Sequence, residues 1–465
     1  TGLYRSDDLG NTWKFVTADA NITARPFYFT HIYANPSNAD ELWSPANKLW
    51  RSVDAGKSWI LEPSAKDDFQ DIWIDPQDPM RMIATCDGGT AVTLTGGKSW
   101  STFANQSGVQ FYRVDTDDQF PYRVYGNAQD LLTYSVPSAS RWGGIPLHMT
   151  DFIGNGETGR AIPKPGDPNI VYGLSTGATF GAATMFTVNN VQTGQTEPRP
   201  IWPEVLFGTP ASEFKYRFNW QAPFLVSPHD PNTIYFAGNV VFRSRDEGMT
   251  WEKISDDLTH NMTDKMKVAG SEWLPEYFGQ ETFSTIHRLA ESPHEQGVLW
   301  AGTDDGRVWI TRDGGGAWTE VTPAGLPELS GIYEIEVSPH DKATTYLAIT
   351  RYRKADDYDP YLLKTSDYGQ TWKRIDGSFP KGQTTKTIRE DTVRQGLLFA
   401  GTETGVYASI DDGETWRRLN LNMPPLPVFD IEIKNADVVI ASHGMGFWIL
   451  DDISPLRQYA AELAS

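Results

Sequence analysis

Hydrophobic and polar residues alternate along this chain in short runs, and most runs end at glycine, proline or aspartate. The segment 283–290 alternates in this way, the apolar runs 298–302 and 307–311 follow after tight turns, and 318–321 completes the group. Alternation over about four to eight residues predicts half-buried β-strands. Because helical periodicity is nearly absent elsewhere, the pattern predicts an all-β protein.

The same group of four strands recurs along the chain. Further copies cover 332–375 and 386–419, an incomplete copy covers 428–450, and two earlier copies precede Trp100. Four short strands per repeat, at a spacing of roughly 45 to 50 residues, are typical of the blades of a β-propeller. The chain is therefore predicted to be a β-propeller with four-stranded blades.

A turn motif recurs between the third and fourth strands of the repeats, with the form Ser-x-Asp-x-Gly-x-Thr-Trp at 244–251. A short carboxylate can accept backbone N–H bonds within its own turn, and glycine readily adopts positive φ. The tryptophan can bury a large ring at the start of the next strand. The motif therefore predicts a hairpin clip with structural aspartates. The aspartates concerned are Asp8, Asp54, Asp246, Asp313, Asp367 and Asp411, and a worn copy at 93–100 has lost its aspartate.

These turns match the Asp-box, or BNR repeat, of the sialidase-like and sortilin-like β-propellers. The resemblance implies that the motif lies on the outer hairpin of each blade, away from the central channel. Nearly the whole chain also resembles a bacterial family of exported tandem-propeller proteins that are often labelled glycosyl hydrolase, through segments such as 71–76, 119–126, 215–220 and 446–457. The tandem-propeller xyloglucanases look like more distant relatives, whose catalytic aspartate segments find no convincing match in this sequence.

About seven blades fit between residues 108 and 452, which is a common size for a closed ring. We therefore expect residues 1–104 to form the closing blades of a first propeller, 105–456 a second, seven-bladed propeller, and 457–465 an exit segment toward a further C-terminal region. An alternative is a single ring of about ten blades. The chain opens with half a blade, so further blades are expected from a preceding part or from another chain.

Composition narrows the possible partners. The formal net charge of -20 argues against nucleic acid or an anionic membrane, because both require basic patches. No apolar run approaches the roughly 20 residues that span a bilayer. The single cysteine, Cys86, excludes an internal disulfide framework. Since the proteins of the family that this chain resembles are exported, we expect this protein to be secreted, periplasmic or on the cell surface.

Several short motifs resemble those of other enzyme classes, but the residues around them do not match the complete patterns. The two Gly-Lys-Ser triplets lack the first glycine of a phosphate-binding loop. The segment 173–177 has the letters of a serine-nucleophile elbow, but no convincing helix follows it. His229, His294 and His340 recur in Ser-Pro-His turns, which indicates a structural role, and no zinc or calcium motif is complete. We therefore expect no cofactor and no metal.

Propellers place ligands at the mouth of the central channel, which the inner strands line. Inverting glycoside hydrolysis needs two carboxylates about 6.5 to 9.5 Å apart. The candidate catalytic carboxylates on predicted inner strands are Asp71, Asp151, Glu157 and Asp430. The candidate ligand-binding residues are His31, Arg113, His287, Glu334 and Arg389.

Three functions are compatible with the sequence. The first is an exported propeller that binds a protein, peptide or glycan at its channel face. We favour this function because no complete set of catalytic residues can be recognised in the sequence. The second is an inverting glycoside hydrolase that acts on a polysaccharide. The third is a structural subunit of an extracellular assembly, which would show large flat interfaces. Two insertions, 260–280 and 351–360, interrupt the repeat, and long loops on a rigid scaffold often carry function.

Overall fold

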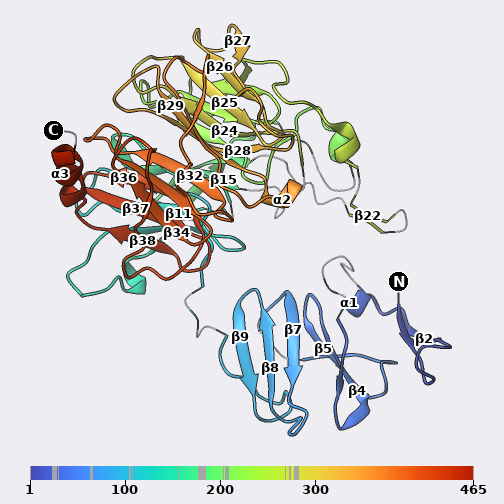
Figure 1. Cartoon of the computed structure of the whole chain (residues 1–465). Coiled ribbons are helices and arrows are strands. Elements are labelled where there is room, and N and C mark those ends of the chain that lie inside the picture. Colours follow the sequence, from blue (N-terminus) through green and yellow to red (C-terminus); the bar gives the residue numbers. More distant parts are fainter. Residues whose placement is uncertain are drawn as a thin grey trace. The chain divides into compact units, whose positions relative to one another are not determined.

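The computed structural model (Figure 1) describes residues 2–23, 29, 31–62, 66–103, 106, 108–154, 156, 158–175, 185–202, 204, 209–267, 269–271, 274–276 and 282–463. The regular secondary structure of this part of the chain is almost entirely β-strand, as the alternating pattern predicts. It divides into two compact units, an N-terminal unit of residues Thr1–Gly108 and a C-terminal unit of residues Val109–Ser465. Each unit is described by itself.

The described strands of the C-terminal unit form seven antiparallel sheets, apart from one separate hairpin. In every sheet the strands are hydrogen-bonded in chain order, so the first strand is one edge and the last is the other. The first three sheets are β10 (Asp115–Thr116), β11 (Arg123–Asn127), β12 (Thr133–Pro137) and β13 (Asp151–Phe152); β14 (Ala161–Lys164), β15 (Asp167–Ser175), β16 (Met185–Asn190) and β17 (Gln195–Pro198); and β18 (Phe224–Val226), β19 (Ile234–Ala237), β20 (Val241–Ser244) and β21 (Glu252–Lys253).

The remaining four sheets repeat this order, and only the seventh has three strands. They are β24 (Ile286–Glu291), β25 (Leu299–Thr303), β26 (Val308–Thr311) and β27 (Trp318–Glu320); β28 (Gly331–Val337), β29 (Thr345–Thr350), β30 (Leu362–Thr365) and β31 (Lys373–Arg374); β32 (Thr385–Glu390), β33 (Leu398–Thr402), β34 (Gly405–Ser409) and β35 (Arg417–Arg418); and β36 (Val428–Lys434), β37 (Asp437–Ser442) and β38 (Phe447–Leu450). The separate hairpin is β22 (Ala269–Ser271) with β23 (Leu274–Glu276).

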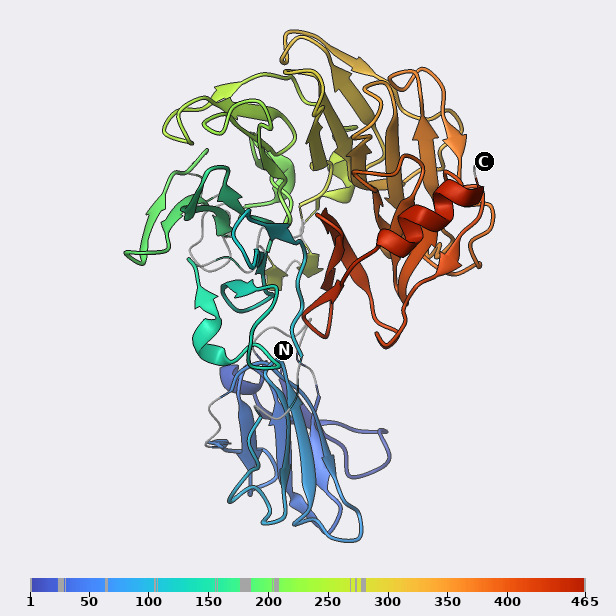
Figure 2. The same ribbon diagram turned by 90° about the vertical axis from the view of Figure 1, so that its left-hand side faces the viewer.

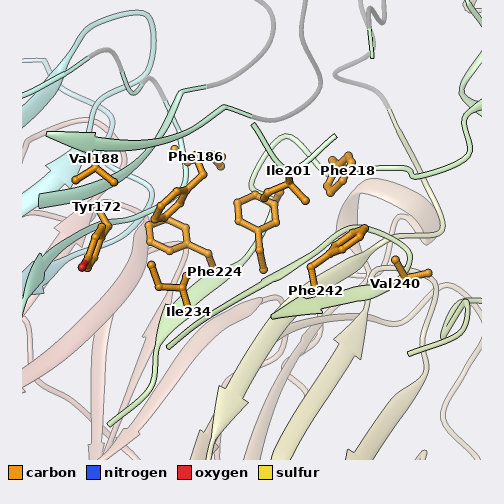
Figure 3. Packing of buried hydrophobic residues seen from close by; sticks show 12 residues of the cluster. Tyr172, Phe186, Val188, Ile201, Phe218, Phe224, Ile234, Val240 and Phe242 are labelled. Carbon is orange, nitrogen blue, oxygen red and sulfur yellow. The ribbon is translucent and has the colours of Figure 1, made fainter. Parts of the chain in front are cut away.

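The seven sheets close into a ring, because each one packs on the next and the seventh packs on the first. Figure 3 shows one such interface, where Tyr172 and Phe186 of the second sheet meet Phe224 and Ile234 of the third. Pairs that represent the other six interfaces, in ring order, are Tyr125 with Val171, Tyr235 with Leu289, Trp300 with Ile332, Tyr346 with Ile388, Phe399 with Val428, and Val439 with Val124.

The closing interface between the seventh and first sheets is made by side chains and a few backbone bonds. Phe111 stacks on Phe447 with their ring centroids 3.8 Å apart. The backbone N–H of Val109 donates to the oxygen of Gly444 at 3.3 Å, and that of Gly444 donates back at 3.0 Å. Figure 2 shows the teal and red ends of the ring side by side. The C-terminal unit is therefore a seven-bladed β-propeller and not part of a ten-bladed ring.

The N-terminal unit repeats the blade without closing. Two sheets pack through Trp43, Leu49, Phe69 and Ile72, and a two-stranded hairpin precedes them. Its elements are β1 (Leu3–Arg5), β2 (Lys14–Thr17), α1 (Ala20–Thr23), β3 (Tyr33–Asn35), β4 (Asn38–Pro45), β5 (Leu49–Ser52), β6 (Ile60–Leu61), β7 (Phe69–Ile74), β8 (Met82–Cys86) and β9 (Gly89–Thr93).

The recurring turn motif forms a hairpin clip, as its residue types predict. In the copy at Asp246, the carboxylate accepts the backbone N–H of Thr250 at 2.9 Å and the Thr250 hydroxyl at 2.6 Å, while Gly248 has a φ of 86°. The side chain of Thr250 is the largest contributor that lowers the pKa of Asp246, to about 2. The clip joins β20 to β21, the two outermost strands of the blade. Its aspartate is thus scaffold, far from the inner strand.

Helices are few and short among the described residues. They are η1 (Leu147–Met149), η2 (Ala211–Glu213), η3 (Thr263–Lys265), α2 (Tyr352–Ala355) and α3 (Ser454–Leu463) in the C-terminal unit. None of the described helices has the length and apolar character needed to cross a membrane. The insertion at 351–360 contains α2. The insertion at 260–280 contains η3 and the β22–β23 hairpin, and part of it lies outside the described residues.

Candidate functional site

The innermost strands of five sheets share one irregularity, a one-residue shift in their register with the second strand. The residues that flank the shift are Phe69 and Asp71, Ile286 and Arg288, Ile332 and Glu334, Thr385 and Thr387, and Val428 and Asp430. Such a bulge re-aims the side chains that follow it. Counting from the shift therefore gives equivalent positions on different sheets.

These positions form three layers in the C-terminal unit. The upper layer is the bulged residue, the middle layer is the residue after the shift, and the lower layer lies two residues further on. The upper layer contains His287, Tyr333, Lys386 and Phe429; the middle layer contains Arg288, Glu334, Thr387 and Asp430; and the lower layer contains Ala290, Glu336, Arg389 and Glu432. Tyr112, Arg113 and Asp115 of the first sheet join the same three layers through the contacts given below.

Three arginines surround one carboxylate in the middle layer. Glu334 accepts hydrogen bonds from Arg288 at 2.6 Å, and it lies 3.0 Å from Arg389 and 3.3 Å from Arg113. Burial alone raises the pKa of Glu334, but the three guanidinium groups outweigh it and hold the pKa at about 2. Arg113 comes from the first sheet and Glu334 from the fifth, so their ion pair crosses the channel.

A second buried carboxylate belongs to the same network. Asp430 accepts a hydrogen bond from Arg389 at 2.7 Å and from the backbone N–H of Val114 at 3.3 Å. Asp430 is 1% exposed and Glu334 is 0% exposed. A general acid or base must reach the substrate directly or through one water. These two carboxylates therefore seal the channel and do not form an accessible catalytic pair.

The lower layer contains two acidic residues, Glu336 and Glu432, that were not among the candidates from the sequence. Glu336 lies 3.5 Å from Arg389, and its side chain is 22% exposed. Burial raises the pKa of Glu336 to about 7, against the attraction of Arg389. Burial also raises the pKa of Glu432, with the negative charge of Asp115 adding to it. This end of the channel can therefore take up protons near neutral pH.

The upper layer is aromatic and differs in chemistry from the two layers below it. His287 stacks on Tyr333 with their centroids 4.3 Å apart, and Phe429 lies 4.0 Å from His443. The Lys386 ammonium lies 3.8 Å from the centroid of the Phe429 ring and 2.8 Å from Glu403. Burial lowers the pKa of His287 well below its usual value, so this ring is neutral. Flat rings thus form the channel wall at this mouth.

The insertion 351–360 lies over this aromatic mouth. Lys386 donates to the hydroxyl of Tyr352 at 3.4 Å, and Lys354 bonds the backbone oxygen of Asp304 in the fourth sheet. The Arg353 guanidinium lies 5.4 Å from the centroid of the Tyr352 ring. In Figure 1 the short helix α2 lies beside the inner strands of the ring. The contacts of the insertion 351–360 thus place it at this mouth of the channel.

The predicted site residues do not gather in one place. Arg113, Glu334, Arg389 and Asp430 meet in the channel network, and His287 lies in the upper layer beside them. The expectation that Asp151 lines the channel is wrong. It begins β13, the outermost strand of its sheet, and pairs with Arg123 at 2.7 Å. Glu157 lies outside the described residues.

His31 and Asp71 form a separate cluster in the N-terminal unit. The Tyr33 hydroxyl lies 3.4 Å from Nδ1 of His31, and burial together with a hydrogen bond to Asp71 raises the pKa of Tyr33 to about 12. Asp71 is exposed and occupies the same register position as Glu334 and Asp430. Among the sequence-predicted carboxylates in the described part of the chain, Asp71 is thus the one that combines solvent access with an inner-strand position.

Arg160, Arg288, Glu336 and Glu432 belong to the channel although they are not among the sequence candidates. Arg160 donates to Asp115 at 3.1 Å, which ties the second sheet to the first. Glu336 and Glu432 lie two residues after the candidates Glu334 and Asp430 in unbroken register, so the alternation of strand side chains is the signal that could have identified them. Arg288 follows the candidate His287 directly, and there the one-residue bulge decides which way the side chain points.

Comparison with known proteins gives weak similarity to xyloglucanases. The xyloglucanase of Hypocrea jecorina is 21% identical over 518 aligned positions, covering 90% of this chain and 60% of that protein. The oligoxyloglucan-reducing end-specific xyloglucanase of Emericella nidulans is 25% identical over 33% of this chain and 17% of its own length. The xyloglucanase Xgh74A of Acetivibrio thermocellus is 23% identical over 44% of this chain and 25% of its own length. No family model matches the chain.

Two solved structures that align over most of the chain are GH74 enzymes, and a third, the computationally designed Ika8 protein, is 12% identical with a TM-score of 0.41 over 80% of this chain. A GH74 enzyme from Niastella koreensis is 13% identical with a TM-score of 0.33, covering 97% of this chain and 79% of that one. The GH74 xyloglucanase of Xanthomonas campestris is 13% identical with a TM-score of 0.28, covering 97% and 82%. The propeller assignment rests on the sheets and interfaces described above. The alignments span at most 60% of the length of the three curated relatives.

Proposed function

We propose that this chain is part of an exported glycoside hydrolase that acts on a xyloglucan-like polysaccharide. The observation that carries the proposal is the sequence similarity to a xyloglucanase over 90% of the chain. The closed propeller agrees with it, because a rigid ring presents loops and inner-strand ends as a fixed binding face. The net charge of -20 also favours an uncharged ligand over a polyanion.

Asp71 is the carboxylate that we assign to the chemistry. It is exposed, it has a tyrosine hydroxyl beside it, and among the described residues no arginine pairs with it as arginines pair with Glu334 and Asp430. An acid or base needs such access to the glycosidic bond.

The test is hydrolysis of xyloglucan, measured as reducing ends released by the purified 465-residue protein. We expect release from the wild type and a loss of at least about 100-fold in Asp71→Asn, within the range for loss of general acid–base catalysis. Asp256→Asn is the matched control, because Asp256 is also an exposed carboxylate. No release from xyloglucan by the wild type would overturn the proposal, and full activity of Asp71→Asn would remove Asp71 from it.

A second candidate function is glycan binding without hydrolysis. The observation that favours it is the sealed channel, since its two middle-layer carboxylates are buried and ion-paired. Binding of xyloglucan without release of reducing ends would support this function. Protein or peptide ligands and a structural role stay predictions from the sequence.

We also propose that the N-terminal unit is the closing part of a larger ring, with residues 105–456 as a second propeller and 457–465 leading out of it. The support is the exposed Ile83 and Val92 on one face of the β7–β9 sheet, at 37% and 40% exposure. Hydrogen exchange on a longer form that carries further sheets tests this, because the added sheet should slow exchange in β8. Unchanged exchange would contradict it.

A further inference from the structure

We propose that the insertion 351–360, together with the upper layer of the channel, binds sugar rings of a neutral glycan. The identity of the ligand rests on the proposed function, but the location of the site rests on the side chains at this mouth. The site is built from residues of the C-terminal unit.

Two aromatic rings of the insertion form the platform of the site. Tyr352 and Tyr358 have their centroids 6.1 Å apart at an interplanar angle of 37°. Tyr358 is 49% exposed, and Tyr352 is half-buried. An exposed aromatic face that is not covered by protein is a surface on which the apolar face of a sugar ring can stack.

A buried lysine ammonium fixes the orientation of the Tyr352 ring. The Lys386 ammonium lies 4.8 Å from the centroid of the Tyr352 ring and 3.8 Å from that of Phe429, and Lys386 is only 2% exposed. Its ion pair with Glu403, at 2.8 Å, holds the ammonium in place. A buried cation between two rings therefore sets the orientation of Tyr352 before any ligand arrives, which reduces the ordering cost of binding.

Planar polar groups border the same rings. The Arg353 guanidinium lies 5.4 Å from the centroid of the Tyr352 ring, it is exposed, and no salt bridge to it is found among the described residues. Asp356 is exposed and Glu403 is partly exposed, and the negative charge of Asp356 with its hydrogen bond to Tyr358 raises the pKa of Tyr358. A guanidinium offers a rigid fork of donors, and carboxylates accept from hydroxyl groups. Donors and acceptors side by side suit the adjacent hydroxyls of a neutral sugar.

A neutral histidine also belongs to this mouth. The His443 ring lies between Tyr112 and Phe429, with ring centroids 5.0 and 4.0 Å away. Burial lowers the pKa of His443 to about 4, and nearby Lys386 and Arg353 add to the shift. The ring is therefore neutral at pH 7 and adds a third flat ring, without charge, to the wall of the mouth.

The experiment is isothermal titration of the 465-residue protein with a xyloglucan oligosaccharide and, separately, with cellohexaose. We expect the double variant Tyr352→Ala/Arg353→Ala to weaken binding by about 100-fold, since stacking and a charged hydrogen bond are each removed at a cost of about tenfold. Tyr358→Ala alone should weaken binding by about tenfold or less.

The matched control is Trp142→Ala/Arg141→Ala. This pair is also an exposed aromatic side chain with a guanidinium near its ring, 5.0 Å from the centroid, but on the loop before η1. We expect unchanged affinity from it. Equal affinity of the Tyr352→Ala/Arg353→Ala variant and the wild type, or absence of binding to both oligosaccharides by the wild type, would overturn the inference. Reducing-end release is measured in parallel, so that binding without hydrolysis supports the site while contradicting the hydrolase proposal.

Discussion

Ile83 of the N-terminal unit occupies the same place in its sheet as Trp300, Tyr346 and Phe399 of the C-terminal unit. Each lies on the second strand, opposite the lower-layer residue. Ile83 is 37% exposed, whereas the other three are at most 1% exposed. In the ring this place faces the next sheet, and no described residue of the N-terminal unit covers it. The corresponding sheet is therefore packed on both faces in the C-terminal unit and on only one face in the N-terminal unit.

The difference extends to the channel position. Asp71, Glu334 and Asp430 share one register position, but only the last two are enclosed by arginines from other sheets. A carboxylate at this position is thus buried and structural when the ring is complete and is available to solvent when it is open. The register sets where the side chain points, and the neighbouring sheets set what it can do.

The largest expected effect comes from truncating a side chain that is buried between two packed sheets. We expect Trp300→Ala to lower the free energy of unfolding of the C-terminal unit by about 3 to 5 kcal/mol, because it leaves a cavity between the fourth and fifth sheets. Ile83→Ala should cost only roughly 1 kcal/mol, since its face is partly in water. Urea unfolding of both variants measures this. Equal costs would show that the open face is covered in solution.

The next effect concerns the channel carboxylates. Glu334→Gln leaves three buried arginines without their shared counter-charge, so we expect a loss of about 3 kcal/mol or more. Asp71→Asn removes an exposed charge at the same register position and should change stability by no more than about 0.5 kcal/mol. Thermal unfolding at pH 7 separates the two. A large loss in Asp71→Asn would contradict the exposed state of that residue.

A smaller effect is the pH dependence of the lower layer. The pKa of Glu336 rises from its usual 4.5 to about 7 on folding, so the folded protein holds this proton more tightly than the unfolded chain does. Its contribution to stability is therefore complete below about pH 4.5 and is lost as pH rises toward 7, with a slope of at most about 1.4 kcal/mol per pH unit. Unfolding of Glu336→Gln across this range should show a flatter profile than the wild type. Parallel profiles would rule out this titration.

The smallest expected effect concerns the third strand of a sheet, which we compare between β9 of the N-terminal unit and β26 of the C-terminal unit. Val92 and Ile310 face Ile83 and Trp300 across their strand pairs, and they are 40% and 4% exposed. We expect Val92→Thr to leave stability within about 0.5 kcal/mol and to reduce the fluorescence of a hydrophobic dye, because less apolar surface is offered to it. Ile310→Thr should lower the unfolding temperature instead. A dye signal that does not respond to Val92→Thr would contradict an open face.

Much of the fold follows from local patterns that the sequence displays directly. The clip at Asp246 uses only residues within one turn, so its hydrogen bonds can be anticipated from residue types. The four-strand repeat gives the ring of seven sheets, because each strand pairs with its neighbour in the chain. Local pairing of this kind needs no knowledge of distant residues.

The candidate site depends on contacts between residues far apart in the chain, and there the sequence is less informative. Arg113 and Glu334 are both candidates from the sequence, but their ion pair joins residues 221 positions apart. Asp151 has an inner-strand pattern by residue type and nevertheless begins an outer strand, since β13 follows a long connection after β12. Glu336 lies two residues after the candidate Glu334 in unbroken register, so the alternation of strand side chains could have identified it.

The join between the seventh and first sheets also determines the order in which the polypeptide can assemble during synthesis. Six of the seven contacts between blades link neighbours in the chain, so each becomes possible as soon as the next blade leaves the ribosome. The stacking of Phe111 on Phe447 must wait for nearly the entire ring to be translated, and it bears the greatest entropic cost of loop formation. Until then, the emerging chain is an open arc whose first blade awaits the last one to be made.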